Sequence, residues 1–196
     1  MRWLGAVGLL LACGAPPGLS PGAVLQPEPP RPEPQPGEIM DRELSLHLDR
    51  CSNRTPAAEF TESSLPWLVE NADRSVPALI ELVVRGGGST ERAARVLGVI
   101  RAPEAVPALH GALQAGLLTH QSASARALWR IGGEAAEAAL REAISGGGGA
   151  ASAALDALAP LKDRDPCALV ALGLATDDGI VQHHARQAAQ RCGCPE

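Results

Sequence analysis

The chain has 196 residues, which is enough for one domain with appendages, and its 45% hydrophobic and 20% charged residues are an ordinary globular balance. With one Phe, three Trp and no Tyr, an aromatic-rich core is excluded, and the core has to be built from Ala, Leu, Val and Ile, which suits thin helical layers. The net charge of −5 excludes a generally basic surface and argues against nucleic-acid binding.

The first residues have the features of an export signal. Arg2 precedes an apolar run over residues 3–11 that is too short to span a membrane as a helix. The run ends in Leu10-Leu11-Ala12-Cys13, which resembles a bacterial lipobox, where the cysteine becomes lipidated and N-terminal. The resemblance implies a signal peptide over residues 1–12, a lipid on Cys13 and, because Gly14 follows, sorting to the outer membrane facing the periplasm. The alternative is an uncleaved apolar start on a cytoplasmic protein.

Residues 13–38 are predicted to form a tether behind the lipid. The part from residue 16 to residue 38 contains nine of the 17 prolines, with Glu, Gln and Gly between them. Such a segment disfavours helix and cannot form a core. It is expected to sample polyproline II, which reaches about 3.1 Å per residue, and so to hold the following domain away from the membrane.

Residues 39–74 are predicted to form an N-terminal helical cap. Within residues 41–50, leucines alternate with charged and polar residues, which favours a helix although the spacing is imperfect. A second short helix is expected over residues 65–72, because Pro66 stands where the first turn of a helix tolerates proline.

From residue 75 the chain repeats itself. The sequence Val76-Pro77-Ala78-Leu79 returns as Val106-Pro107-Ala108-Leu109, with degenerate copies at residues 137–140 and 166–169. A second motif recurs at intervals of 31, 30 and 31 residues, and its copies stand at residues 93–97, 124–128, 154–158 and 185–189. Each unit therefore contains two apolar stretches with helical spacing.

Turn residues separate the two stretches of a unit. Glycines at 86–88 and 146–149 are expected to follow the ends of first helices, and Pro77 and Pro107 to mark the first turns of first helices. A unit of two short helices cannot bury its own apolar face, so neighbouring units must stack.

The sequences VPALIEL at residues 76–82 and ERAARVLGVI at residues 91–100 resemble HEAT-like repeats of the type seen in phycobilisome lyases. The resemblance covers residues 75–192 and implies an all-α fold for residues 75–196. The expected architecture is a short right-handed α-solenoid of about four helical hairpins, ending near residues 101, 132, 162 and 192. The motif specifies fold strongly and function weakly. The Val-Arg pair that usually opens the second helix is absent from most units, so weaker polar ties between repeats are expected.

The same resemblance implies that the second helices line a concave face. Equivalent exposed positions are Arg95, Arg126, Asp156 and Gln187. The candidate binding face consists of Arg92, Arg95, Arg126, Trp129 and Arg130. Arginines at repeat spacing could bind an acidic peptide or a carboxylate, and the alternative is a solvated helix face with local charge partners. Trp129 is interpreted either as core filling or as a groove anchor.

The cysteines predict a disulfide. Cys167 begins the first helix of the fourth unit and Cys192 ends the second, so the antiparallel pair brings Cys167 beside Cys192 or Cys194. Cys51 would then be left with the remaining one, at the other end of the solenoid. The alternative is a redox or metal thiol cluster with His183 and His184. Adjacent histidines point to different faces of a helix and no tetrahedral ligand spacing appears, so no metal site is predicted.

No catalytic residue, cofactor or nucleic-acid partner is predicted. The letters G-x-S-x-G at residues 18–22 lack the strand and helix that the motif requires, and no metalloprotease, P-loop or dinucleotide motif is present. The sequence therefore predicts a non-catalytic protein–protein interaction scaffold of the bacterial cell envelope, bound to the membrane through its N-terminal lipid, with an unnamed protein or peptide partner. The alternatives are a structural subunit of an envelope complex, and an accessory subunit or enzyme using Cys and His chemistry near the C-terminus.

Overall fold

The computed structural model describes residues 36–52 and 54–195. The predicted signal peptide, the predicted lipid site Cys13 and the tether as far as residue 35 lie outside the described residues. Within the described ranges, regular structure is helical apart from one isolated bridge between Leu161 and Arg164. The predicted all-α class is therefore confirmed.

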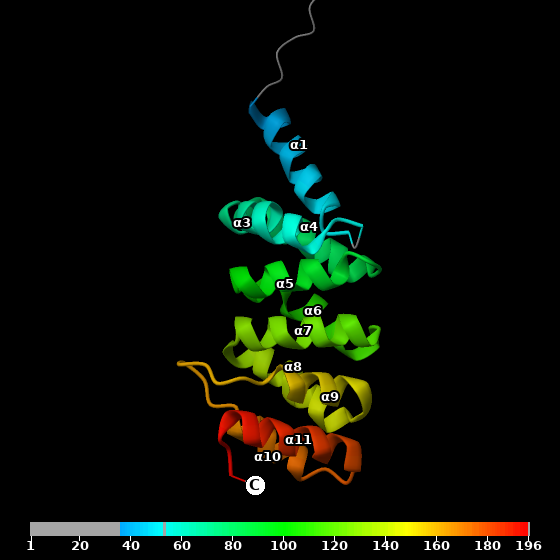
Figure 1. Cartoon of the computed structure of the whole chain (residues 1–196), viewed down its shortest axis with the longest axis vertical. Coiled ribbons are helices and arrows are strands. Elements are labelled where there is room, and N and C mark those ends of the chain that lie inside the picture. The colour runs from blue at the N-terminus through cyan, green and yellow to red at the C-terminus, as the bar shows by residue number, and fades with distance from the viewer. Residues whose placement is uncertain (1–35, 53, 196) are drawn as a thin grey trace, which may run out of the picture. The chain divides into compact units, whose positions relative to one another are not determined.

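The first described elements form the N-terminal helical region (Figure 1). They are α1 (Pro36–Asp49), α2 (Ala57–Glu59), the π-helical segment η1 (Phe60–Ser64) and α3 (Leu65–Glu70). Helix α1 contacts α3 and α4, and α3 contacts η1, α4 and α5. The two predicted cap helices are thus present, whereas α2 and η1 were not predicted.

The remaining helices form four consecutive pairs, and a 3-10 turn η2 (Pro103–Ala105) precedes α6. The pairs are α4 (Ala72–Arg85) with α5 (Thr90–Ile100), α6 (Val106–Ala115) with α7 (Leu118–Ile131), α8 (Gly133–Gly146) with α9 (Gly148–Ala157), and α10 (Cys167–Leu174) with α11 (Gly179–Cys192). The members of each pair pack together, first helices contact successive first helices, and second helices contact successive second helices. Each predicted unit therefore contains the two helices expected of it.

Three predicted boundaries are wrong. Helix α1 begins at Pro36, so the end of the predicted tether is helical, because a first turn tolerates proline. Helix α4 begins at Ala72, so Pro77 lies inside it. Pro77 and Asp73 are both exposed, so water can bond the Asp73 carbonyl that the proline leaves unpaired. The third unit ends at Ala157, and residues 158–166 are irregular because Pro160 disfavours helix at and before its position.

Helices α5 and α7 approach each other closely at Gly98. A Cβ built on Gly98 would lie 2.8 Å from the Ala127 Cα, whereas a Cβ on Gly111, in α6, would meet nothing within 4 Å. At this crossing the small core residues predicted from the composition include a glycine, which has no side chain.

The two glycines are expected to respond in opposite directions to the same substitution. Gly111→Ala should raise the free energy of unfolding by about 0.5–1 kcal/mol, because alanine is the better helix former and the space is open. Gly98→Ala should lower it by about 1–2 kcal/mol, because the added carbon forces α5 away from α7. Urea unfolding followed by circular dichroism measures both. Shifts of the same sign would contradict the close approach.

Candidate functional site

A groove of about 450 Å³ lies over α5 and α7 and reaches the N-terminal helical region. Its lining residues are Ala57, Phe60, Glu91, Arg92, Arg95, Val99, Ala123, Arg126, Ala127 and Arg130. Four of the five residues of the predicted binding face therefore come together in one groove, which is called the arginine groove below.

The helical period and the repeat together place these side chains. On α5, Arg95 and Val99 are four residues apart, and on α7, Arg126 and Arg130 are four residues apart, so each pair shares one face of its helix. Helices α5 and α7 pack side by side. Because the repeat is 31 residues long here, Arg95 corresponds to Arg126 and Val99 corresponds to Arg130.

The arginine groove is strongly basic. It contains four arginines and the single acidic residue Glu91. Arg95, Arg126 and Arg130 are exposed, and in the part of the chain that the structure describes none of the three forms an ion pair. A chain with a net charge of −5 thus concentrates positive charge at one place.

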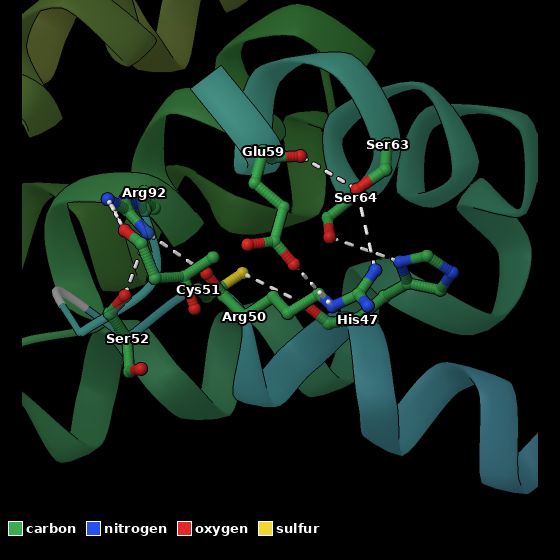
Figure 2. A network of polar contacts seen from close by, with 9 residues as sticks. His47, Arg50, Cys51, Ser52, Glu59, Ser63, Ser64 and Arg92 are labelled. Atoms are coloured by element: carbon green, nitrogen blue, oxygen red, sulfur yellow. Dashed lines mark hydrogen bonds and ion pairs between the residues drawn. The ribbon is translucent and has the colours of Figure 1, made fainter. Parts of the chain in front are cut away.

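Arg92 has a different role from the other three. Its guanidinium donates hydrogen bonds to the carbonyl oxygens of Arg50 (3.0 Å), Ser52 (2.7 Å; Figure 2) and Thr55 (2.7 Å). It also lies 5.0 Å from the centre of the Phe60 ring. Arg92 therefore fastens the segment that follows α1 to α5. It forms the wall of the groove, and three of the five N–H donors of its guanidinium are already used.

Trp129 does not belong to the groove. Its side chain is 3% exposed, and its indole N–H donates to the Ala159 carbonyl at 3.0 Å. The Arg164 guanidinium lies 5.6 Å from the centre of the indole ring. Of the two interpretations of Trp129, core filling is correct and the groove anchor is wrong, because the indole faces the irregular segment 158–166.

At the repeat position of Arg95 and Arg126, exposed arginines occur on α5 and α7 but not on the later second helices. Asp156 on α9 and Gln187 on α11 are exposed, as their positions in the repeat predicted. Asp156 Oδ1 lies 2.8 Å from His184 Nδ1. The second-helix face is therefore basic on α5 and α7 and carries an acidic group on α9.

Two arginines that sequence reasoning missed tie neighbouring elements together. Arg164 donates to the carbonyl oxygens of Trp129, Arg130 (3.2 Å) and Ile131 (3.0 Å) at the end of α7. Arg191 on α11 donates to the Leu155 carbonyl of α9 at 3.0 Å. Arginine is favourable at helix C-termini, where carbonyls lack partners. Polar ties between neighbouring elements are therefore present at these two arginines, and no sequence motif marked either residue.

Cys167 and Cys194 form a disulfide with a Cα–Cα distance of 5.3 Å, one of the two pairings that the sequence left open. Cys51 and Cys192 are both free, so Cys51 does not pair with the remaining C-terminal cysteine. Burial raises the pKa of the Cys51 thiol to about 12, against the lowering effect of Arg92. Burial also raises the pKa of Cys192. Both thiols are therefore less nucleophilic than an exposed cysteine.

Asp165, His183 and His184, the other candidate ligands near the C-terminus, also have neighbours that argue against a metal site. The Asp165 carboxylate lies near both bridged sulfurs, but sulfurs joined in a disulfide are not thiolate ligands for a metal. His184 contacts Asp156, whereas His183 Nε2 lies 2.9 Å from the Gln187 side-chain nitrogen. The two histidines thus face different neighbours, as their adjacency predicted.

A second polar network joins α1 to η1 (Figure 2). His47 Nδ1 lies 3.1 Å from the Ser64 hydroxyl, and the His47 ring stacks on Trp67 with ring centres 4.5 Å apart. Arg50 pairs with Glu59 at 3.5 Å. Ser64 is fully buried, so its hydroxyl is not accessible as a nucleophile. The contacts of His47 therefore dock α1.

His47 is expected to make stability depend on pH. Burial lowers its pKa, nearby Arg50 lowers it further and Glu43 opposes them. The unfolded chain therefore binds a proton more readily than the folded one, and stability should fall as pH drops from 7.5 through about 6.5. Urea midpoints between pH 8 and 5 measure this. His47→Gln should flatten the slope; an unchanged slope in this variant would assign the effect to another group.

No family model matches the chain, and comparisons with curated proteins and with solved structures give no match either. In the described ranges, no helix has both the length and the apolar character needed to cross a membrane.

Proposed function

We propose that the chain is a non-catalytic protein–protein interaction scaffold, built as a short right-handed α-solenoid of HEAT-like hairpins with α1–α3 as its N-terminal cap. The pattern of contacts between helices supports this architecture, because each helix pair packs mainly on the pairs next to it in the chain. That pattern is typical of repeat proteins, which use the resulting extended surfaces for binding.

The arginine groove is the observation that carries the proposal. Arg95, Arg126 and Arg130 project from two neighbouring second helices into one groove and have no ion-pair partner among the described residues. Guanidinium groups bind carboxylates through paired, charge-assisted hydrogen bonds. A protein partner that offers carboxylates to this groove would supply the missing counter-charges.

The proposed location is the bacterial cell envelope, with a lipid on Cys13 and the domain held in the periplasm at the outer membrane. The Cys167–Cys194 disulfide supports an oxidising compartment. The composition of residues 13–35 supports a tether.

Site-directed photo-crosslinking in the cells that express the full chain tests the interaction. A photoreactive residue at Val99, inside the groove, is compared with one at Val84, an exposed valine on α4 outside the groove. A discrete protein adduct is expected from position 99 alone. It should disappear when Arg126→Glu and Arg130→Glu are added and persist with Arg141→Glu, an exposed arginine on α8. An adduct from position 99 that still forms when Arg126 and Arg130 are replaced would refute the proposal.

A further inference from the structure

We infer that the arginine groove binds an extended acidic segment of a partner protein in which two glutamates are separated by one residue. This inference rests on the proposed function and narrows it to a ligand pattern. In an extended segment, residues i and i+2 point to the same side and lie roughly 6.5–7 Å apart. Arg126 and Arg130 are separated by one helical turn, with β carbons about 5–6 Å apart. Their long side chains can bridge the remaining difference, so each arginine can bind one carboxylate.

Arg95 adds a second guanidinium for one of the two carboxylates. The repeat places it beside Arg126 on the neighbouring helix, and both side chains line the groove. A carboxylate has two oxygens and about four acceptor positions, so it can take hydrogen bonds from two guanidinium groups at once. The Arg126 end is therefore expected to be the stronger of the two subsites.

Val99 favours a glutamate side chain over an inorganic anion. It is 41% exposed and lies in the groove, at the repeat position of Arg130. Ala123 and Ala127 also line the groove. Phosphate would leave this apolar surface in contact with water, whereas the two methylene groups of a glutamate can cover it, a gain that grows with the apolar area buried.

Acidic groups on both sides confine the glutamate pair to α7. Glu91 lines the groove on α5, and Asp156 is exposed on α9 at the repeat position of Arg95 and Arg126. Each repels a carboxylate placed next to it, so a segment with a longer run of acidic residues should bind with little more affinity than one with a single glutamate pair. Repulsion of unsuitable ligands contributes to specificity together with attraction of the suitable one.

Fluorescence anisotropy with labelled twelve-residue peptides tests the inference on the full chain with its disulfide intact. The probe carries one Glu-Ala-Glu in a Gly/Ser background, and the comparison peptides carry Gln-Ala-Gln, Asp-Ala-Asp or Lys-Ala-Lys. We expect the Kd to rise about 10- to 100-fold from Glu-Ala-Glu to Gln-Ala-Gln, since two charge-assisted contacts are lost. We expect a smaller rise for Asp-Ala-Asp, and weaker binding as salt increases.

Variants assign the binding to the groove. Arg126→Gln should weaken the Glu-Ala-Glu peptide about tenfold or more, and Arg141→Glu should leave its Kd unchanged. The double variant Arg126→Glu/Arg130→Glu should prefer Lys-Ala-Lys, a reversal that an unfolded protein could not show. Circular dichroism confirms that each variant is folded.

Three results would overturn the inference: equal binding of Glu-Ala-Glu and Gln-Ala-Gln, displacement of the peptide by inorganic phosphate at equal concentration, or tighter binding of a single-stranded oligonucleotide. If the Glu-Ala-Glu peptide does not bind, but the adduct at position 99 forms and depends on the arginines, the ligand pattern is wrong and the proposed function stands. If the peptide binds as expected and no adduct forms, the groove chemistry is correct and the scaffold function is refuted.

Discussion

Replacing Trp129 with alanine is expected to lower the free energy of unfolding by about 3–5 kcal/mol, the range typical of buried large-to-small changes at tryptophan. The indole is 3% exposed, donates to the Ala159 carbonyl and lies under the Arg164 guanidinium. Alanine would leave a cavity, remove the hydrogen bond to Ala159 and leave the Arg164 guanidinium without the ring that it covers. The loss should therefore exceed that of any surface substitution proposed above.

Urea unfolding monitored by circular dichroism measures this loss, because removing a tryptophan changes the fluorescence signal itself. Trp129→Phe serves as the comparison, since it keeps an aromatic ring but loses the N–H donor and three ring atoms. Its expected cost is smaller, with about 0.5–1.5 kcal/mol from the lost hydrogen bond, because Ala159 is exposed and water can bond its carbonyl. A loss below 1 kcal/mol for Trp129→Ala would show that the segment 158–166 does not close over the indole.

Reducing the Cys167–Cys194 disulfide is expected to lower the free energy of unfolding by about 3.5 kcal/mol in the chain-entropy model. The two cysteines are 27 residues apart and join the start of α10 to the residues just after α11. This last helix pair has a neighbouring pair on one side only within the described residues. The cross-link therefore restricts the unfolded chain where native packing is least extensive.

Unfolding midpoints with and without a reductant measure the effect. Cys192→Ser is the matched control, because it removes a nearby thiol and keeps the disulfide, and it should show the same shift on reduction as the wild type. Cys194→Ser should unfold like the reduced wild type and no longer respond to reductant. A response lost in Cys192→Ser and kept in Cys194→Ser would instead assign the bridge to Cys192.

The repeat allowed most helices to be located from the sequence. Two copies of Val-Pro-Ala-Leu at matching positions placed α4 and α6, and the second motif placed α5, α7, α9 and α11. The errors arose where local chemistry interrupts the period. Pro160 ends the third unit early, and the start of α4 at Ala72 lies before the repeated motif begins. A period fixes which residues are equivalent, but it does not fix where a helix ends.

The candidate site could be predicted in part. Arg95 and Arg126 were found because the repeat aligns them, and Arg130 was found because it lies close to them in the sequence. The burial of Trp129 depends on residues 158–166, which contact α7. The carbonyl contacts of Arg92 depend on Arg50, Ser52 and Thr55, which lie outside the repeat. Irregular segments have no period, so their contacts could not be inferred from one.

Gly98 sets the distance between the two helices that carry the arginine groove. It precedes Val99, and the residue that it touches, Ala127, follows Arg126. The distance between α5 and α7 at this point therefore also sets the span between the guanidinium groups of Arg95 and Arg126. A methyl group at position 98 would lie between the two helices and would widen that span. Natural selection for the ligand that fits the groove would therefore also act on Gly98, although it has no side chain.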